Sequence, residues 1–194
     1  GEKQTGLTTF FIDEEIDTGK IILQEKMNIG DEETAGELHD RMMKQGAKLV
    51  LKTVDAIEKG DVQEVEQDEL LDTKELKKAP KIFKEDCLID WEKPVREIYN
   101  FIRGLSPLPV AWTEIVKNNQ RKTNVKIYKA DYKEEKHDNN IGKVITDNKN
   151  YFHIAANDGV IIVKELQLPG RKRMSIQEFL RGNRAENWCV EVDD

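Results

Sequence analysis

The sequence predicts a short α/β segment followed by an all-β barrel that ends in a helix. Two apolar runs near the N-terminus precede a long stretch of helical periodicity, and residues 61–78 are highly charged. Beyond Val110, short apolar runs alternate with polar turns. With 194 residues, of which 38% are apolar, the chain is long enough for one large or two small domains with a real core.

The α/β prediction rests on the first 60 residues. Residues 6–12 and 20–27 are expected to form strands, both apolar enough to lie within a buried sheet. Acidic residues after Gly30 suit the start of a helix, and Gly60 suits its end. We expect the helix to cover the sheet edge of an α/β domain whose other half is missing. Its apolar face is predicted to hold Leu38, Met42, Leu49, Val50, Val54 and Ile57.

The barrel prediction rests on the remaining residues. Residues 61–78 are expected to be an exposed connector, and residues 94–104 a helix that stops at Ser106–Pro109. A terminal helix is expected from Ser175, which forms a capping-box pattern with Glu178. Five or six short strands with a terminal helix fit a small barrel, and the OB-fold is the leading version. The expected strands are residues 111–116, 124–132, 142–147, 151–156 and 159–168. Turns are expected at residues 117–119 and, as a hairpin turn, at residues 157–159.

Composition limits the classes of function. The net charge is −7, but it divides into −10 for residues 1–100 and +3 for residues 101–194, so the C-terminal part is basic enough to meet phosphate. Cys87 and Cys189 are far apart and have no metal-ligand spacing around them, so we expect neither a disulfide framework nor a metal site. With no long apolar span and no N-terminal signal pattern, we expect a cytoplasmic protein.

An acidic turn between the first two predicted strands is the leading candidate for chemistry. From the residues alone, Asp-Thr-Gly at 17–19 also fits an ordinary turn. However, Gly6, Thr8 and the segment 16–22 resemble the acidic loop of the formyltetrahydrofolate-dependent formyltransferases. The resemblance implies a catalytic role for Asp17 and 10-formyltetrahydrofolate as the formyl donor, with no metal. It also implies that the backbone of Asp13, Glu14, Glu15 and Ile16 lines the pteridine pocket.

Two further segments narrow the resemblance. Residues 79–107, with Ala-Pro-Lys-Ile at 79–82, and residues 168–180 resemble the C-terminal part of the methionyl-tRNA formyltransferase family. That family transfers a formyl group to the methionine α-amine of initiator methionyl-tRNA in translation initiation. Its Asn-x-His-x-Ser-Leu-Leu-Pro motif, which precedes the catalytic Asp, is absent here, so we expect a fragment that is inactive alone. The fragment is still expected to bind tRNA. The full-length enzyme is expected to be a monomer.

The resemblance also suggests a division of the chain. Residues 1–60 are expected to be the end of a Rossmann-like formyltransferase domain, residues 61–91 a linker, and residues 92–194 an OB-like tRNA-binding domain. Trp91 and Trp112 are predicted to pack in the core rather than to stack on bases.

Basic residues are the candidates for contact with tRNA phosphates. Lys81 is proposed because the family's linker meets tRNA there. Lys126 lies on a predicted strand, where Lys129 would face the opposite side if the strand were regular. The stronger cluster is Arg171, Lys172 and Arg173 with Arg181 on the following helix. Charges of this kind are often only solvated surface.

Two alternatives to this interpretation remain. The chain could belong to another formyltetrahydrofolate-dependent enzyme, a sugar formyltransferase or a hydrolase. It could also be a non-catalytic OB-type module that binds nucleic acid. The basic segment at 171–173 favours a tRNA substrate over the first alternative, and the intact acidic loop speaks against the second.

Overall fold

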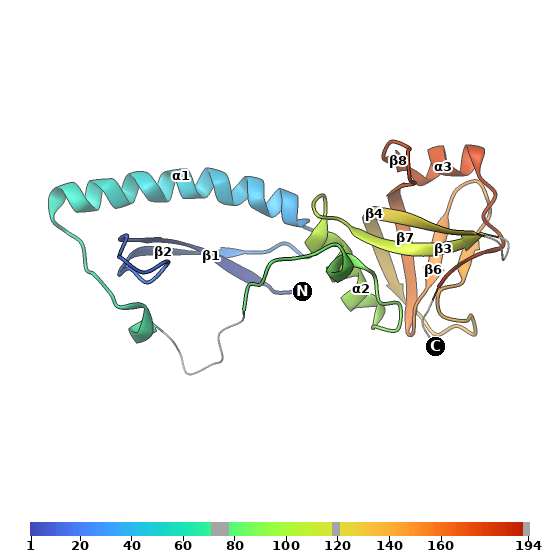
Figure 1. Ribbon diagram of the computed structural model, residues 1–194, viewed down its shortest axis with the longest axis horizontal. Helices are drawn as coiled ribbons and strands as arrows, with labels where there is room; N and C mark the ends of the chain where they lie inside the picture. The colour runs from blue at the N-terminus through green and yellow to red at the C-terminus, as the bar shows by residue number, and fades with distance from the viewer. Residues whose placement is uncertain (71–77, 118–120, 192–194) are drawn as a thin grey trace. The chain divides into compact units, whose positions relative to one another are not determined.

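The structure is a computed structural model that describes residues 1–70, 78–117 and 121–191 (Figure 1). The backbone contacts divide the chain into two compact units, which are described separately. The first, called here the hairpin unit, comprises residues 2–33 and 37–81. The second, called here the barrel unit, comprises Gly1, residues 34–36 and residues 82–194.

The hairpin unit contains one antiparallel strand pair and one long helix. Strand β1 (Gln4–Phe10) pairs with β2 (Ile21–Asn28), and α1 (Ala35–Lys59) follows. These elements lie within a few residues of the predicted ones. The prediction of buried strands was wrong for β1, whose residues alternate between exposed and partly buried. Alternation is the pattern of a sheet that is covered on one face.

Helix α1 meets the hairpin through a small polar contact. The hydroxyl of Thr53 donates to the Leu49 carbonyl at 2.8 Å and lies 2.9 Å from the hydroxyl of Thr9 on β1. Leu49 is buried, whereas Val50 and Val54 are exposed, which corrects the predicted burial of the whole apolar face. Two strands are too narrow to cover the full apolar width of the helix.

Residues after α1 return to the hairpin instead of serving only as a connector. Val65 pairs with Ile21, and the two residues exchange backbone hydrogen bonds of 2.8 and 3.1 Å. A short 3-10 helix, η1 (Gln67–Leu70), follows. Residues 61–69 are mostly exposed, as expected, but the stretch also pairs with β2 and is more than a connector. Residues 71–77 of the predicted linker lie outside the described residues.

The barrel unit is built on a sheet in the order β5-β6-β7-β4-β3-β9, with β8 paired to β7 (Figure 1). Its edges meet, because the Val190 amide donates to the Gly142 carbonyl at 2.8 Å and Lys143 pairs with Cys189. The antiparallel sheet is thus nearly closed. The strands are β3 (Ala111–Lys117), β4 (Arg121–Glu134), β5 (Val144–Thr146), β6 (Phe152–Ala155), β7 (Gly159–Gln167), β8 (Met174–Ser175) and β9 (Trp188–Val190).

The five predicted strands correspond to β3–β7, and the sequence did not reveal β8 or β9, which are two and three residues long. The predicted hairpin turn at 157–159 is confirmed by the Ala156 amide, which donates to the Gly159 carbonyl at 2.8 Å. The turn predicted at Lys117-Asn118-Asn119 falls largely on residues 118–120, outside the described part of the chain.

Within the described part of the barrel unit, three helices pack on or beside this sheet: η2 (Glu85–Cys87), α2 (Val95–Leu105) and α3 (Ile176–Gly182). The predicted capping box is present, since Ser175 and Glu178 exchange side-chain-to-backbone hydrogen bonds. Trp91 is 2% exposed and donates from Nε1 to the hydroxyl of Thr113 at 2.9 Å, which confirms its packing role. Across the described residues, no helix combines the length and the apolarity needed to cross a membrane.

Candidate functional sites

The acidic loop connects β1 to β2 and has a constrained backbone. Its base is closed by the Phe11 amide, which donates to the Lys20 carbonyl at 2.9 Å. Asp17 has a φ of 61°, in the left-handed region that few non-glycine residues adopt. At Gly19 a Cβ atom would lie 1.6 Å from the Phe11 carbonyl oxygen, so only glycine fits. The loop therefore fixes the direction in which the Asp17 side chain projects from the backbone.

Gln67 holds this loop from a distant part of the chain. Its side-chain amide donates to the Asp17 carbonyl at 2.7 Å and to the Gly19 carbonyl at 2.9 Å. Lys20 adds ion pairs to Glu64 at 3.4 Å and to Glu66 at 3.2 Å, and these hydrogen-bonded carboxylates raise the pKa of Lys20. Sequence reasoning missed Gln67, because nothing local links it to a turn about fifty residues earlier.

The other predicted folate residues all lie exposed on the same loop. The Glu14 amide donates to the Asp13 carboxylate at 2.6 Å, and the Thr18 hydroxyl donates to the Glu15 carbonyl at 3.2 Å. Ile16 is 90% exposed and Ile12 is 96% exposed. The loop thus offers carboxylates, backbone groups and two apolar side chains to a ligand.

The barrel unit has a groove of about 520 Å³, called here the basic groove. It is lined by three segments that are distant in sequence: residues 82–84 with Cys87, residues from β3 and β4 with the turn before β3, and residues 167–170. Lys84 and Lys126 are its charged lining residues, and no described lining residue is acidic. Val110, which lines it too, has a φ of 79°, rare for a β-branched residue.

A second hollow on the barrel unit has the opposite charge. It has a volume of about 420 Å³ and is lined by Glu85, Asp90, Glu92, Glu114 and Glu191 among others. The barrel unit therefore separates its charges: one hollow repels phosphate and the other attracts it. The excess of positive charge in the C-terminal half does not by itself reveal this separation.

Strand β4 contains an irregularity beside the basic groove. Lys126 pairs with Gln167 and Lys129 pairs with Glu165, with register shifts on both sides of Lys129. Because Gln167 and Glu165 are two residues apart on β7, their partners share one face of the sheet. Strand β4 is therefore not regular here. Lys126 and Lys129 lie on the same face of the sheet, whereas a regular strand would place them on opposite faces.

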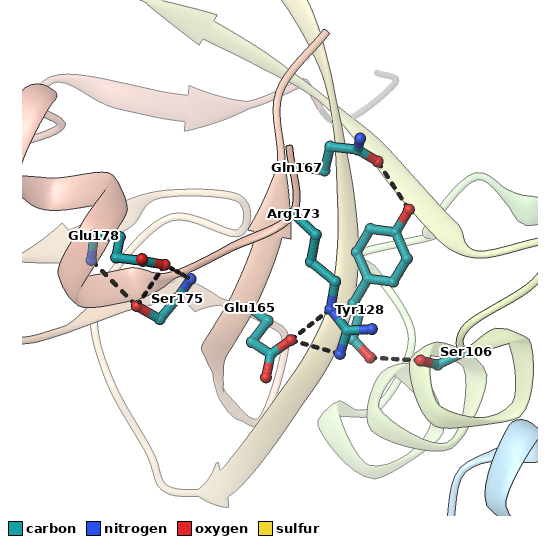
Figure 2. Close-up of polar contacts among 7 residues, drawn as sticks. All are labelled: Ser106, Tyr128, Glu165, Gln167, Arg173, Ser175 and Glu178. Atoms are coloured by element: carbon teal, nitrogen blue, oxygen red, sulfur yellow. Dashed lines mark hydrogen bonds and ion pairs between the residues drawn. The ribbon is translucent and has the colours of Figure 1, made fainter. Parts of the chain in front are cut away.

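Tyr128 lies at this irregularity and anchors the loop of residues 168–173, which follows β7 and is called here the basic loop (Figure 2). Its hydroxyl donates to the Gln167 side chain at 2.8 Å, and the Gln167 amide donates to the Arg171 carbonyl at 2.8 Å. The guanidinium of Arg173 lies 4.6 Å from the centre of the Tyr128 ring and forms an ion pair with Glu165. Arg173 is therefore part of the structural support of the loop.

The structure brings several predicted tRNA residues to one region. Lys126 lines the basic groove, and exposed Arg171 and Lys172 follow the lining residue Gly170. Lys81 is the last residue of the hairpin unit and is not a lining residue. Arg181 is exposed on α3 and is not a lining residue. Sequence spacing groups Arg171 with Lys172, but it does not reveal that Lys126 lies in the same region.

Trp112 also lines the groove and is only partly buried. Its Nε1 donates to the Lys84 carbonyl at 2.8 Å, and the Lys84 ammonium lies 5.3 Å from the ring centre. Trp112 thus packs against Lys84 rather than offering that face of its ring to a base.

Comparison with known proteins assigns both units to one family. A family model described as "Formyl transferase, C-terminal domain" matches residues 81–184, and another described as "Formyl transferase" matches residues 1–54. The chain belongs to the formyl transferase family. The segment matched at residues 1–54 contains the Asp17 loop, and the segment matched at residues 81–184 contains the basic groove. Gln67 lies between the two matched segments.

A methionyl-tRNA formyltransferase of Phocaeicola vulgatus is 49% identical to this formyl transferase over 188 residues. The match covers 96% of this chain and 58% of the relative, so the chain spans little more than half of the relative's length. A second one, from Bacteroides thetaiotaomicron, is 47% identical over 184 residues, covering 95% of this chain and 57% of that relative.

Solved structures resemble the chain as well. HypX from Aquifex aeolicus, in complex with tetrahydrofolic acid, matches with a TM-score of 0.66 at 20% identity, covering 92% of this chain and 30% of HypX. At that identity the likeness concerns the fold alone. WlaRD, a sugar 3N-formyl transferase solved with dTDP and 5-N-formyl-THF, matches with a TM-score of 0.55 at 26% identity, covering 88% of this chain and 57% of WlaRD.

Proposed function

We propose that the chain is the C-terminal part of a methionyl-tRNA formyltransferase. The complete enzyme would transfer the formyl group of 10-formyltetrahydrofolate to the methionine α-amine of initiator methionyl-tRNA, and the chain alone would bind tRNA without catalysis. The observation that carries the proposal is the 49% identity to a methionyl-tRNA formyltransferase over both units. The constrained presentation of Asp17 supports it.

In this proposal Asp17 is the catalytic group supplied by the chain. The amine nitrogen forms a bond to the formyl carbon, and the bond between that carbon and the donor nitrogen breaks. The attacking amine loses one proton and the departing donor nitrogen gains one, so the transfer leaves the number of protons unchanged. A carboxylate beside the reacting groups stabilises positive charge that develops during this transfer and orients the groups that carry the proton. A fixed backbone at Asp17 reduces the reorganisation needed to reach that geometry.

The loop residues are compatible with a folate ligand. A pteridine ring can be bound by apolar side chains and backbone hydrogen-bonding groups, and residues 12–16 offer two exposed isoleucine side chains and an exposed backbone segment. We assign the ligand contacts to the backbone of Asp13, Glu14, Glu15 and Ile16. The folate supplies the formyl group when it is bound.

We place the tRNA contact on the basic groove and its rim. Lys126, Arg171 and Lys172 would meet phosphates there, and Lys81 and Arg181 are proposed as separate phosphate contacts outside the groove. The nearly closed antiparallel sheet is consistent with an OB-like barrel, a fold that binds oligonucleotides on its surface. As a translation enzyme, the protein would act in the cytoplasm and, at full length, as a monomer.

The test uses a reconstituted enzyme, in which this chain is joined to the part of the Phocaeicola vulgatus relative that it does not cover. We expect formylation of initiator methionyl-tRNA with 10-formyltetrahydrofolate, and a loss of at least about 100-fold for Asp17→Asn. Asp55→Asn, which changes an exposed carboxylate on α1 in the same way, is the matched control. Near-normal turnover of Asp17→Asn would remove Asp17 from catalysis.

The same enzyme distinguishes the proposal from a sugar formyltransferase, the alternative that the likeness to WlaRD keeps open. Initiator methionyl-tRNA and a dTDP-linked amino sugar are supplied as competing acceptors. Formylation of the sugar in preference to the tRNA would overturn the proposed substrate and leave the reaction type intact.

A further inference from the structure

We propose that the basic groove binds one unpaired nucleotide of the RNA substrate, with the base against Phe83 and the phosphates near Lys84 and Lys126. The inference rests on the proposed function, because it specifies how part of a tRNA would be held. It adds a ligand site that the tRNA-phosphate contacts alone do not imply.

The apolar part of the groove suits the face of a base. Phe83 is 57% exposed and Ile82 is 53% exposed, although both line a concave surface. Large apolar side chains that stay exposed in a hollow mark binding sites more often than isolated exposed ones do. The volume of about 520 Å³ is in the range of small-ligand pockets. A nucleobase is planar, and each of the bases can stack on an aromatic ring.

The charge of the groove selects an anionic ligand. Both charged lining residues are lysines, and no acidic residue is found among the described lining residues. This is notable in a chain of net charge −7, and the acidic hollow on the same unit shows that the separation is local. A ligand with an apolar planar part and a nearby negative charge matches these features, and a nucleotide has both.

The groove favours an unpaired nucleotide over a duplex. Bases inside a duplex are stacked on each other, so an aromatic side chain at the surface cannot reach their faces. An unpaired base can leave the stack and place its face against Phe83. Asn124, which lines the groove, has an amide with donors and an acceptor that can read a base edge.

Both sides of the groove are held in place before a ligand arrives. On one side, Trp112 donates to the Lys84 carbonyl at 2.8 Å. On the other, the Tyr128 hydroxyl donates to the Gln167 side chain at 2.8 Å (Figure 2), and Gln167 donates to the Arg171 carbonyl at 2.8 Å. A site fixed in this way loses little conformational entropy on binding.

The test measures binding of the whole 194-residue chain to a short single-stranded RNA that carries 2-aminopurine and to a blunt-ended RNA duplex with the same number of phosphates. We expect tighter binding of the single strand, with quenched 2-aminopurine fluorescence. Phe83→Ala should weaken single-strand binding about tenfold. Phe83→Leu keeps the apolar bulk without the ring and should show most of the same loss. Tyr151→Ala, an exposed aromatic that does not line the groove, is the matched control.

The outcomes separate this inference from the proposed function. Equal affinity for the single strand and the duplex, or equal effects of Phe83→Ala and Tyr151→Ala, would overturn the nucleotide site. If initiator methionyl-tRNA still bound in that case, tRNA binding by the chain would stand without a stacking site. Absence of binding to every RNA would overturn both.

Discussion

The side-chain amide of Gln67 bridges the carbonyls of Asp17 and Gly19, with a 2.7 Å hydrogen bond to the first. Asp17 has left-handed backbone geometry, and such geometry persists where surrounding contacts maintain it. A residue outside both segments matched to the family thus controls the position of the proposed catalytic carboxylate.

Loss of this bridge should lower turnover without affecting tRNA affinity. In the reconstituted enzyme we expect Gln67→Ala to reduce kcat about tenfold, because two hydrogen bonds of about 1 kcal/mol each are removed from the loop. Gln67→Glu should behave similarly, since a carboxylate cannot donate to the carbonyls. Steady-state kinetics and tRNA binding are measured together. Gln63→Ala, an exposed change nearby, is the control, and an equal effect of both alanine variants would contradict the role of Gln67.

The absence of a side chain at Gly19 should be essential for the hairpin unit. Gly19→Ala would place Cβ against the Phe11 carbonyl at 1.6 Å, so we expect a loss of about 3 kcal/mol or more in unfolding free energy. Gly46→Ala lies within α1, where the nearest atom would be 4.0 Å away, and should gain about 0.5–1 kcal/mol. Urea unfolding followed by far-ultraviolet circular dichroism compares the two. Similar stabilities would contradict the close approach.

The basic residues after β7 should differ in how they bind RNA. Replacing exposed Arg171 and Lys172 by Gln should reduce the slope of log affinity against log salt by about 2. Arg173→Gln should reduce it by less than about 1, because the Arg173 guanidinium is already paired with Glu165. Titrations of initiator methionyl-tRNA over a salt series measure the slopes. Equal loss per charge at all three positions would show that Arg173 also meets phosphate.

His153 should make the stability of the barrel unit depend on pH. Burial lowers the pKa of His153, and the charge of Lys164 acts in the same direction. The unfolded chain therefore binds a proton more readily than the folded one. Stability from this group is complete above its unfolded pKa of about 6.5 and falls as the pH drops toward the folded value.

Replacing His153 by Gln removes the group whose protonation causes this loss of stability. Thermal melts across this acidic range should show a smaller fall in Tm for His153→Gln than for the unaltered chain. His39→Gln, on the exposed surface of α1, should leave the fall unchanged. An undiminished fall in His153→Gln would assign the pH dependence to other groups.

The sequence alone determined most elements and the nature of the loop. Alternating and helical periodicity located β1, β2, α1 and most of the barrel strands, and the Ser175 capping box located α3. These features depend on residues a few positions apart, so they are readable without the fold. The same is true of the acidic turn at Asp17 and the basic run that begins at Arg171.

Tertiary structure decided what these elements bring together. The bulge at Tyr128 puts Lys126 and Lys129 on one face, contrary to the alternation of a regular strand. The segment around η2, which pairs with β3 through Leu88 and Trp112, places residues 82–84 in one groove with residues 167–170. The return of the chain after α1 brings Gln67 to the Asp17 loop. Each depends on strand register and long-range packing, which local periodicity does not encode. The sequence therefore supplied the chemical groups, and the fold decided which of them share a site.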